Sequence, residues 1–312
     1  MAYHPAVRWR FRAWVGAVLA AISGLQAAQT FRVATYNLEN YLLEPVGTRP
    51  AKSEAARAKI RESLRAAKAE VLALQEVGGT NALLELRDAL EREGLAYPHW
   101  ELVQGWDTNI QVAVLSKFPL VARRPHTNES FLLQGRRFCV SRGFAEVDVR
   151  VNPRYQFTLF TAHLKSRRVV PEADDAELRQ QEGLLLREKI DARLAAQPNA
   201  NLVVAGDLND TKSALSTRAV LGRYSIKLVD TRPAEHNGDN QPSPDPRYDP
   251  RHITWTYFYG KEDSYSRIDY ILLSRGMARE WLPAESYVLA LPNWGVGSDH
   301  RPVVATFTAE DL

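Results

Sequence analysis

The chain has 312 residues, of which 45% are hydrophobic and 25% are charged, with 40 Lys and Arg residues against 37 Asp and Glu residues. These values indicate one large globular domain or two small ones, and they exclude a globally disordered chain. The formal net charge of +3 gives no argument for a nucleic-acid partner. A single cysteine, Cys139, excludes an intramolecular disulfide, and we expect it to lie buried in a strand.

Residues 1–28 have the pattern of a signal peptide. Three arginines between residues 8 and 12 form a basic region, and an apolar run over residues 13–22 follows. This run is long enough for the core of an export signal and too short to span a bilayer. A lone amphipathic helix or a retained anchor is the alternative. We therefore predict a signal peptide over residues 1–28, one mature domain over residues 29–312 that is near neutral in charge, and a periplasmic or extracellular location.

Short apolar runs alternate with stretches of helical periodicity in the first half of the chain. In chain order, we expect a strand over residues 31–36, a helix over 53–69, a strand over 70–75, a helix that opens at Thr80–Asn81, and strands over 111–116, 143–151 and 156–162. The order continues with a helix over residues 177–196 and strands over 201–205, 266–274 and 302–308.

Two later segments differ from these elements. Residues 233–252 are rich in Pro, Asp, Asn and Arg and almost lack apolar side chains, so they predict a long loop. A solvated surface loop is one interpretation, and a structural Ca²⁺ loop built on Asp239, Asp245 and Asp249 is the other. Residues 254–259 form an aromatic strand whose rings either pack in the core or stack on a base or sugar.

Polar side chains follow almost every predicted core strand at the point where the strand ends. Groups tethered to strand ends are held rigidly and can converge at one rim of a sheet. Isolated buried carboxylates are costly unless they are paired or bound to a metal, so a whole series of them is hard to explain as ordinary turns. The series consists of Asn37, Glu39, Glu76, His163, Asp207, Asn209, Asp269, Asp299 and His300.

The residue types in this series favour one kind of chemistry. Oxygen ligands without cysteine favour a hard cation, Mg²⁺ or Mn²⁺, over zinc. The two histidines titrate near neutral pH and can move protons. A cation, a base and a donor are the parts needed to hydrolyse a phosphate ester. The sequence has no Walker-type glycine loop, no G-x-S-x-G motif and no Cys–His pair.

Six segments in this order resemble the signature series of the endonuclease/exonuclease/phosphatase superfamily. They are Thr-Tyr-Asn37-Leu-Glu39-Asn, Leu-Gln-Glu76-Val, Thr-Ala-His163-Leu-Lys, Gly-Asp207-Leu-Asn209-Asp, Arg-Ile-Asp269-Tyr-Ile-Leu and Ser-Asp299-His300-Arg-Pro. The superfamily includes pancreatic deoxyribonuclease, abasic-site endonucleases, neutral sphingomyelinases and inositol polyphosphate 5-phosphatases. The resemblance extends from Phe31 to Phe307. It implies a four-layer α/β sandwich, in which two face-to-face, mostly antiparallel β-sheets are flanked by helices, with a Mg²⁺-type site at one rim.

The resemblance also implies metal ligands. Glu76 would be the principal ligand of a divalent cation, Mg²⁺ or Mn²⁺. Asn37, Asp299 and Glu39 would support it. For Glu39, an exposed turn carboxylate is the alternative. A Ca²⁺ ion would have a structural role only.

Five further residues receive catalytic roles from the resemblance. His300 would be the general base, with Asp269 orienting its imidazole, and Asp207 is the rival for the role of base. Asp207 and Asn209 would hold the attacking water and the phosphate, or a second metal. His163 would contact the scissile phosphate or serve as acid. A histidine at this position resembles the deoxyribonuclease, sphingomyelinase and phosphatase branches more than the abasic-site enzymes.

Structural roles remain open for two of these positions. Asp269 could instead pair with Arg267, and His163 could be a packed strand-end histidine. We expect Asp210 to be a turn or cap residue.

The function predicted from these motifs is metal-dependent hydrolysis of phosphodiester bonds by a monomeric nuclease acting on DNA or RNA through in-line attack of water. A phospholipid head group or small phosphoester is the alternative substrate, as for a sphingomyelinase, although the sequence shows no obvious apolar hairpin for membrane docking. A non-catalytic binding protein on the same fold is the third hypothesis. We expect no stable membrane insertion after signal removal. The basic clusters that favour nucleic acid are Arg136, Arg137 and Arg142, and Lys165, Arg167 and Arg168.

Overall fold

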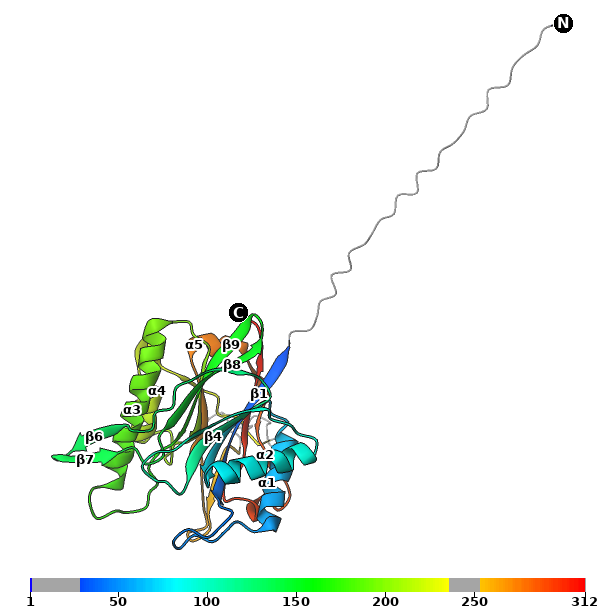
Figure 1. Cartoon of the computed structure of the whole chain (residues 1–312). Helices are drawn as coiled ribbons and strands as arrows, with labels where there is room; N and C mark the ends of the chain where they lie inside the picture. The colour runs from blue at the N-terminus through cyan, green and yellow to red at the C-terminus, as the bar shows by residue number, and fades with distance from the viewer. Residues whose placement is uncertain (2–28, 236–252, 312) are drawn as a thin grey trace, which may run out of the picture.

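The computed structural model describes Met1, residues 29–235 and residues 253–311, in which two six-stranded sheets pack face to face between helices (Figure 1). The predicted signal peptide over residues 1–28 and the three aspartates of the Ca²⁺ interpretation lie outside the described residues. Within the described residues, none of the helices is long and apolar enough to cross a membrane.

The first sheet has a parallel pair of strands, β1 and β2, at its centre. The other pairings in this sheet are antiparallel. In spatial order, its strands are β15 (Trp281–Val288), β16 (Val303–Thr308), β1 (Thr30–Tyr41), β2 (Val71–Val77), β4 (Gln111–Ser116) and β3 (His99–Val103).

The second sheet repeats this plan, with β9 and β10 as its parallel central pair. In spatial order, its strands are β11 (Val229–Asp230), β14 (Asp269–Leu273), β10 (Leu202–Asp207), β9 (Tyr155–His163), β8 (Phe144–Asn152) and β5 (Leu120–Arg123). Two small hairpins lie outside both sheets: β6 (Ser130–Leu133) with β7 (Arg136–Cys139), and β12 (Tyr257–Tyr259) with β13 (Ser264–Ser266).

Helices cover the outer face of each sheet (Figure 1). The helices over the first sheet are α1 (Glu54–Ala67) and α2 (Thr80–Arg92), and those over the second are α3 (Asp175–Ala196) and α4 (Leu215–Leu221). A short helix, α5 (Arg275–Glu280), follows β14. Ser53 and Asp174 cap the first turns of α1 and α3 by accepting backbone N–H bonds, which fixes where these helices begin.

The period of two along each strand produces three apolar layers. In β1, Phe31 and Val33 point into the core between the sheets, whereas Ala34 and Tyr36 point outward and pack under α1 beside Ile60. A third apolar layer lies between the second sheet and α3. Three apolar layers between four layers of secondary structure confirm the predicted four-layer α/β sandwich with mostly antiparallel sheets.

The structure corrects several sequence-based expectations. Cys139 is exposed rather than buried, because its hairpin projects from the sandwich (Figure 1). The strand expected over residues 266–274 begins only at Asp269, and only Tyr257–Tyr259 of the aromatic segment forms strand pairs. The predicted helix over residues 177–196 begins at Asp175, because Asp174 is its cap.

Candidate active site

The topology brings the polar strand ends to one rim of the sandwich. In the second sheet, Asp207 at the end of β10 lies beside His163 at the end of the parallel strand β9. It also lies beside Asp269, the first residue of the antiparallel strand β14. In the first sheet, Asn37 lies where β1 runs parallel to β2, and Glu76 is one residue farther along β2 than the partner of Asn37. The carboxyl ends of both central pairs therefore meet at the same rim.

Irregular backbone in the first sheet turns its polar side chains toward this rim. The pairing of β1 with β2 shifts register between Asn37 and Tyr41, where Glu39 and Asn40 have φ of 48° and 55°. Glu76 has φ of 62°, at a register shift between β2 and β4. Such bulges re-aim side chains, and left-handed backbone at residues other than glycine is strain that clusters at functional sites.

Hydrogen bonds across the rim join the two sheets. Asn37 Nδ2 donates to Asp207 Oδ2 at 3.0 Å and to Glu76 Oε1 at 3.3 Å. The backbone N–H of Asn40 donates to the other oxygen of Glu76 at 2.8 Å. His163 Nε2 lies 3.5 Å from Asp207 Oδ2 and 3.9 Å from Glu76 Oε1. Residues that are far apart in the sequence thus converge on one centre.

A buried dyad also faces this centre, formed by Asp269 of β14 and His300 of the segment that precedes β16. His300 Nδ1 lies 2.9 Å from Asp269 Oδ2, and the hydroxyl of Thr256 donates to the same oxygen at 2.6 Å. The other ring nitrogen of His300, Nε2, lies 3.8 Å from both Asp207 Oδ2 and Asp299 Oδ1. The dyad therefore leaves one imidazole nitrogen directed toward the cluster of carboxylates.

The alternative partner of Asp269 is excluded. Both terminal nitrogens of Arg267 donate to the carboxylate of Asp230, at 2.9 Å and 2.6 Å. The expectation that Asp210 has a structural role agrees with its contacts, because it accepts from Arg179 Nε at 2.9 Å and pairs with Arg167 at 3.3 Å.

The electrostatics of the rim differ from those of ordinary surface carboxylates. Burial, with a contribution from Asp269, raises the pKa of Asp207. Burial, with contributions from Glu39 and Glu76, raises the pKa of Asp299 to about 6. Burial and mutual repulsion therefore disfavour the ionised form of these carboxylates in the cation-free protein.

The site shifts the pKa values of its two histidines in opposite directions. Burial alone would lower the pKa of His300, but the adjacent Asp269 carboxylate and Asp207 raise it to about 10. Burial, together with the positive charges of Arg142 and His300, lowers the pKa of His163 well below its ordinary value. His163 is therefore neutral at physiological pH, whereas His300 is protonated in the cation-free protein.

Two predicted site residues lie at the margin of the cluster. The side chain of Glu39 is 44% exposed, and its Oε2 lies 3.6 Å from Lys52 Nζ. Asn209 donates its backbone N–H to Asp207 Oδ1 at 2.7 Å and its amide to the carbonyl of Leu164 at 2.9 Å. Asn209 thus positions the Asp207 carboxylate, while Glu39 borders the cluster from the solvent side.

Three residues of this rim are absent from the sequence-based candidates. Thr256 is fully buried and holds Asp269, and the ring of Tyr257 lies 4.7 Å from that of His300. Lys52 Nζ donates to the carbonyls of Leu38, Glu39 and Gly297 and so joins the β1 bulge to the segment before Asp299. Thr256 and Tyr257 belong to the aromatic segment over residues 254–259, which the sequence analysis interpreted through its aromatic rings alone.

The donor atoms of the rim fit a divalent cation. Asp207, Asp269 and His300 offer ligand atoms that all lie within 4.8 Å of one another. The 2.9 Å bond commits His300 Nδ1 and Asp269 Oδ2 to each other, but the buried Asp269 Oδ1 has no hydrogen-bond partner among the described residues. Carboxylate oxygens at this density are stable together when a hard cation neutralises them.

The first predicted basic cluster is divided between two places. Arg136 and Arg137 are exposed on β7, in the projecting hairpin. Arg142 is buried, donates to the carbonyl of Leu164 at 3.2 Å and lies close enough to His163 to lower its pKa. In the second cluster, Arg167 Nε donates to the carbonyl of Asn209 at 3.1 Å, which places this arginine beside the rim.

Comparison with known proteins identifies the family. The chain belongs to the endonuclease/exonuclease/phosphatase family, whose model matches residues 34–300. It therefore has the metal-dependent phosphoesterase fold of this family, with the acidic and histidine cluster described above at its rim. Among curated proteins, no sequence matches the chain.

Solved structures share the fold at low sequence identity. The human Nocturnin catalytic domain with bound sulfate has 18% identity and a TM-score of 0.62, over 90% of this chain and 95% of that chain. Sphingomyelinase C from Streptomyces griseocarneus has 20% identity and a TM-score of 0.58, over 90% of this chain and 100% of that chain. An endonuclease/exonuclease/phosphatase from Beutenbergia cavernae has 21% identity and a TM-score of 0.56, over 90% and 72% of the two chains.

Proposed function

We propose that the protein hydrolyses phosphodiester bonds in nucleic acid by in-line attack of water, and that it acts in the periplasm or outside the cell. The observation that supports the chemistry is the Asp269–His300 dyad, whose free nitrogen faces Asp207 and Asp299 beside Glu76. The family match supports a phosphoester as the bond that the protein cleaves. The location rests on the signal pattern of residues 1–28 alone.

We assign the cation to the carboxylates at the centre of the rim. Glu76 and Asp299 would hold it, with Asn37 and Glu39 in support, and Mg²⁺ or Mn²⁺ suits such oxygen ligands. When bound, a divalent cation supplies positive charge that stabilises the non-bridging phosphate oxygens and lowers the pKa of a nearby imidazolium.

The protein side chains have separate roles in the proton transfers. His300, in its neutral form, accepts a proton from the attacking water at Nε2, while Asp269 holds Nδ1 and Thr256 holds Asp269. We prefer His300 over Asp207 as the base. Nδ1 of His300 is bound to Asp269, so Nε2 is the ring nitrogen that faces the centre. Asp207, fixed by the backbone of Asn209, orients the water.

His163 serves as a hydrogen-bond donor to the phosphate in this proposal. Its lowered pKa makes it neutral at physiological pH, so it retains one ring N–H but has no extra proton to give to the leaving oxygen. Between the two roles predicted for His163, we therefore prefer contact with the phosphate over general-acid catalysis, and the leaving oxygen takes its proton from solvent water.

A substrate panel tests this proposal. Purified protein is incubated with plasmid DNA, with RNA and with bis(p-nitrophenyl) phosphate, each with Mg²⁺ or Mn²⁺ and each with a chelator. We expect cleavage of nucleic acid that the chelator abolishes. Nucleic acid that stays intact under both metals would contradict the nuclease assignment, and turnover of the small diester would then show that only the substrate was wrong.

A phospholipid head group is the second candidate substrate, and one structural observation favours it. The β6–β7 hairpin projects from the sandwich (Figure 1), and its Leu132 is 64% exposed near the exposed Arg136 and Arg137. One of the structurally similar proteins is a sphingomyelinase C. Hydrolysis of sphingomyelin vesicles without cleavage of nucleic acid would support this second candidate.

A further inference from the structure

A positively charged groove runs along the edge of the second sheet, outside the rim described above. A cavity of ≈ 990 Å³ lies beside β11, α4 and the loop that joins them. Its only acidic lining residue among the described residues is Asp230, whose carboxylate is paired with Arg267. Its basic lining residues are Lys212, Arg218, Arg223, Lys227 and Arg275. Five cations and one acid leave an excess of four positive charges, which exceeds the +3 of the whole chain.

The cations of this groove have no ion-pair partners within the described residues, in contrast to many arginines elsewhere on the surface. Arg57, for example, pairs with both Glu54 and Glu85. All five groove cations are exposed. Like charges gathered around one hollow repel one another, and such a local excess attracts an anionic partner over a distance of about 10 Å at moderate salt.

The loop that carries part of the groove is rigidly held. The side chain of Arg187 is only 7% exposed, and it donates to the carbonyls of Val220, Leu221 and Ile226 at 3.1, 3.2 and 2.8 Å. These bonds fix both ends of the turn that contains Tyr224. The groove therefore has a preorganised wall rather than a loose one.

Tyr224 stands out on this wall. Its side chain is 89% exposed, although its backbone has φ of 56°, a conformation that is uncommon for a bulky residue. Because the ring of Tyr224 lies in solvent, core packing does not compensate for this backbone strain. An exposed ring next to unpaired cations is the combination that binds single-stranded nucleic acid, because bases stack on the ring while cations contact phosphates.

The groove adjoins a second cavity whose lining residues neighbour the proposed active site in the sequence. Lys212 also lines a smaller cavity of ≈ 400 Å³, together with Thr211, Trp255 and Tyr265. Trp255 directly precedes Thr256, which holds the Asp269 carboxylate of the dyad. A strand that leaves the groove past Lys212 would enter this second cavity, beside the segment that carries Thr256.

We infer that this groove binds a single strand of nucleic acid outside the scissile phosphate, with Tyr224 as a stacking platform and the five cations as phosphate contacts. The inference rests on the proposed nuclease function, since it names how that substrate is held. A hollow between a helix and an edge strand fits a chain of nucleotides better than it fits a flat lipid surface.

The binding test is carried out in a chelator, so that no cleavage occurs. A fluorescein-labelled 20-nucleotide DNA strand is titrated by fluorescence anisotropy across a series of salt concentrations. The groove variant combines Arg223→Gln, Lys227→Gln and Arg275→Gln. The control variant combines Lys68→Gln, Arg92→Gln and Arg150→Gln, exposed cations on other faces that form no ion pair within the described residues.

We expect the groove variant to bind roughly tenfold more weakly at low salt, and the slope of log K against log salt to fall by about 2, since each contact with a single strand contributes about 0.7. Tyr224→Ala alone should weaken binding by roughly fivefold or more. The control variant should remain within about twofold of the wild type. All variants should hydrolyse bis(p-nitrophenyl) phosphate like the wild type, because none of the changes touches the rim.

Three results would overturn the inference. The groove variant could bind as tightly as the wild type, the control could lose as much as the groove variant, or the wild-type protein could bind vesicles containing anionic lipid but not the oligonucleotide. If the groove variant misfolds and loses small-diester hydrolysis, oligonucleotide binding by Tyr224→Ala still tests the inference. Because binding is measured without metal, failure of the groove and failure of the nuclease proposal remain distinguishable: an oligonucleotide can bind here and still resist cleavage when Mg²⁺ is restored.

Discussion

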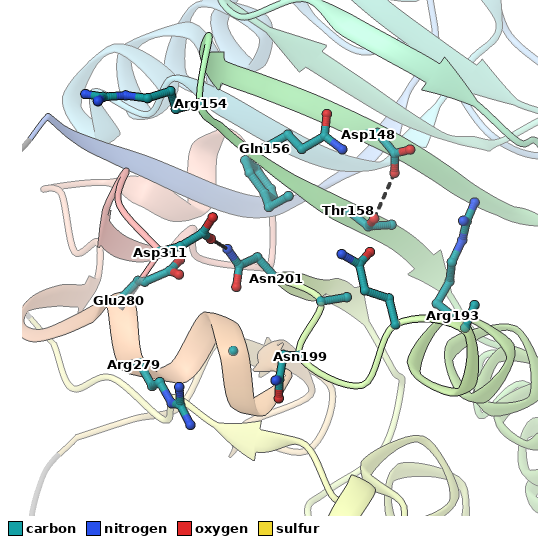
Figure 2. A pocket seen from close by; sticks show the side chains of 15 residues that line it. Asp148, Arg154, Gln156, Thr158, Arg193, Asn199, Asn201, Arg279, Glu280 and Asp311 are labelled. Atoms are coloured by element: carbon teal, nitrogen blue, oxygen red, sulfur yellow. Dashed lines mark hydrogen bonds between the residues drawn. The ribbon is translucent and has the colours of Figure 1, made fainter.

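Both ends of the central strands carry charged side chains, but the two ends differ in how those charges are balanced. At the end opposite the rim, a cavity of ≈ 760 Å³ lies beside the first residues of β9 and the segment before β10 (Figure 2). Each carboxylate that lines it has a donor in contact. These pairs are Thr158 with Asp148, Asn201 with Asp311, and Tyr155 with Glu280.

At the rim, the carboxylates also accept hydrogen bonds, but they converge on one centre. Among the described residues, no lysine or arginine lies within 4 Å of the carboxylates of Glu76, Asp207, Asp269 or Asp299. The basic side chains within this distance are the two histidines, of which His163 is neutral. The comparison teaches that neither a large cavity nor an abundance of charge identifies the site of chemistry. The site of chemistry is identified by a cluster of carboxylates that no lysine or arginine pairs with and that a divalent cation can neutralise.

The strongest expected effect comes from the dyad, which has no counterpart at the opposite end. His300→Ala should lower kcat for phosphodiester hydrolysis by 10²- to 10⁴-fold, about 3–5 kcal/mol, because the general base is lost. Mg²⁺ affinity should survive, since Glu76 and Asp299 remain. His99→Ala, in the edge strand β3, is the matched control and should keep full activity. Near-normal turnover by the His300 variant at neutral pH would assign the base to another group.

The next effect is smaller because it acts through a neighbour. Thr256→Val removes the hydroxyl that donates to Asp269 Oδ2 but keeps the shape of the side chain. We expect kcat to fall roughly 10- to 100-fold, in line with the loss of an outer hydrogen bond that orients a ligand. The pH–rate profile should shift as well, and Thr256→Ser should restore most of the activity. A loss of thermal stability with an unchanged pH–rate profile would show that Thr256 only packs.

A carboxylate that is paired with cationic side chains and a carboxylate of the rim should also respond to pH with opposite signs. Burial alone would raise the pKa of Glu146, but hydrogen bonds from His126, Arg124 and Arg193 lower it to about 2, so Glu146 stabilises the fold above about pH 4.5 and ceases to do so as the pH falls toward 2. Glu146→Gln should therefore cost on the order of 3 kcal/mol at pH 7 and progressively less below pH 4.5.

Asp299 should show the reverse in a chelator. Its pKa in the folded protein is raised to about 6, so ionising it costs stability as the pH rises from about 4 through 6. Asp299→Asn should consequently gain stability relative to the wild type over this interval. Denaturant unfolding of both variants at several pH values measures these differences, and the same sign for both would remove the contrast between the paired carboxylate and the carboxylate of the rim.

The smallest expected effect is at the margin of the rim. Glu39 is partly exposed and its charge is paired with Lys52, so Glu39→Gln removes about 1 kcal/mol or less of interaction. We expect kcat/KM with Mg²⁺ to fall by less than about fivefold. A loss as large as that of His300→Ala would mean that Glu39 ligates the cation directly, as the sequence resemblance implied.

The sequence allowed the core strands and the residues of the rim to be predicted, because both depend on local patterns. Alternating apolar residues locate β1, and the polar residue that ends each core strand locates Asp207 and His163. The bulges at Glu39 and Glu76 were not predictable, since a register shift depends on two strands at once. Thr256 was missed for a related reason: only the folded chain brings its hydroxyl to a carboxylate from another strand.

Short and projecting elements were also missed. The edge strands β3 and β5 and the β6–β7 hairpin have few buried side chains, so their sequences lack a clear alternation. Exposure of Cys139 follows from that hairpin, which no local pattern indicated.

Thermal unfolding with and without Mg²⁺ tests most directly whether the rim is a cation site and the opposite end is not. The wild-type protein should gain stability with rising Mg²⁺ concentration, since a ligand that binds only the folded state raises Tm by mass action. Glu76→Gln should lose most of this gain, whereas Asp311→Asn at the opposite end should keep it. A wild-type Tm that does not change with Mg²⁺ or Mn²⁺, or a gain that persists in Glu76→Gln, would contradict the account.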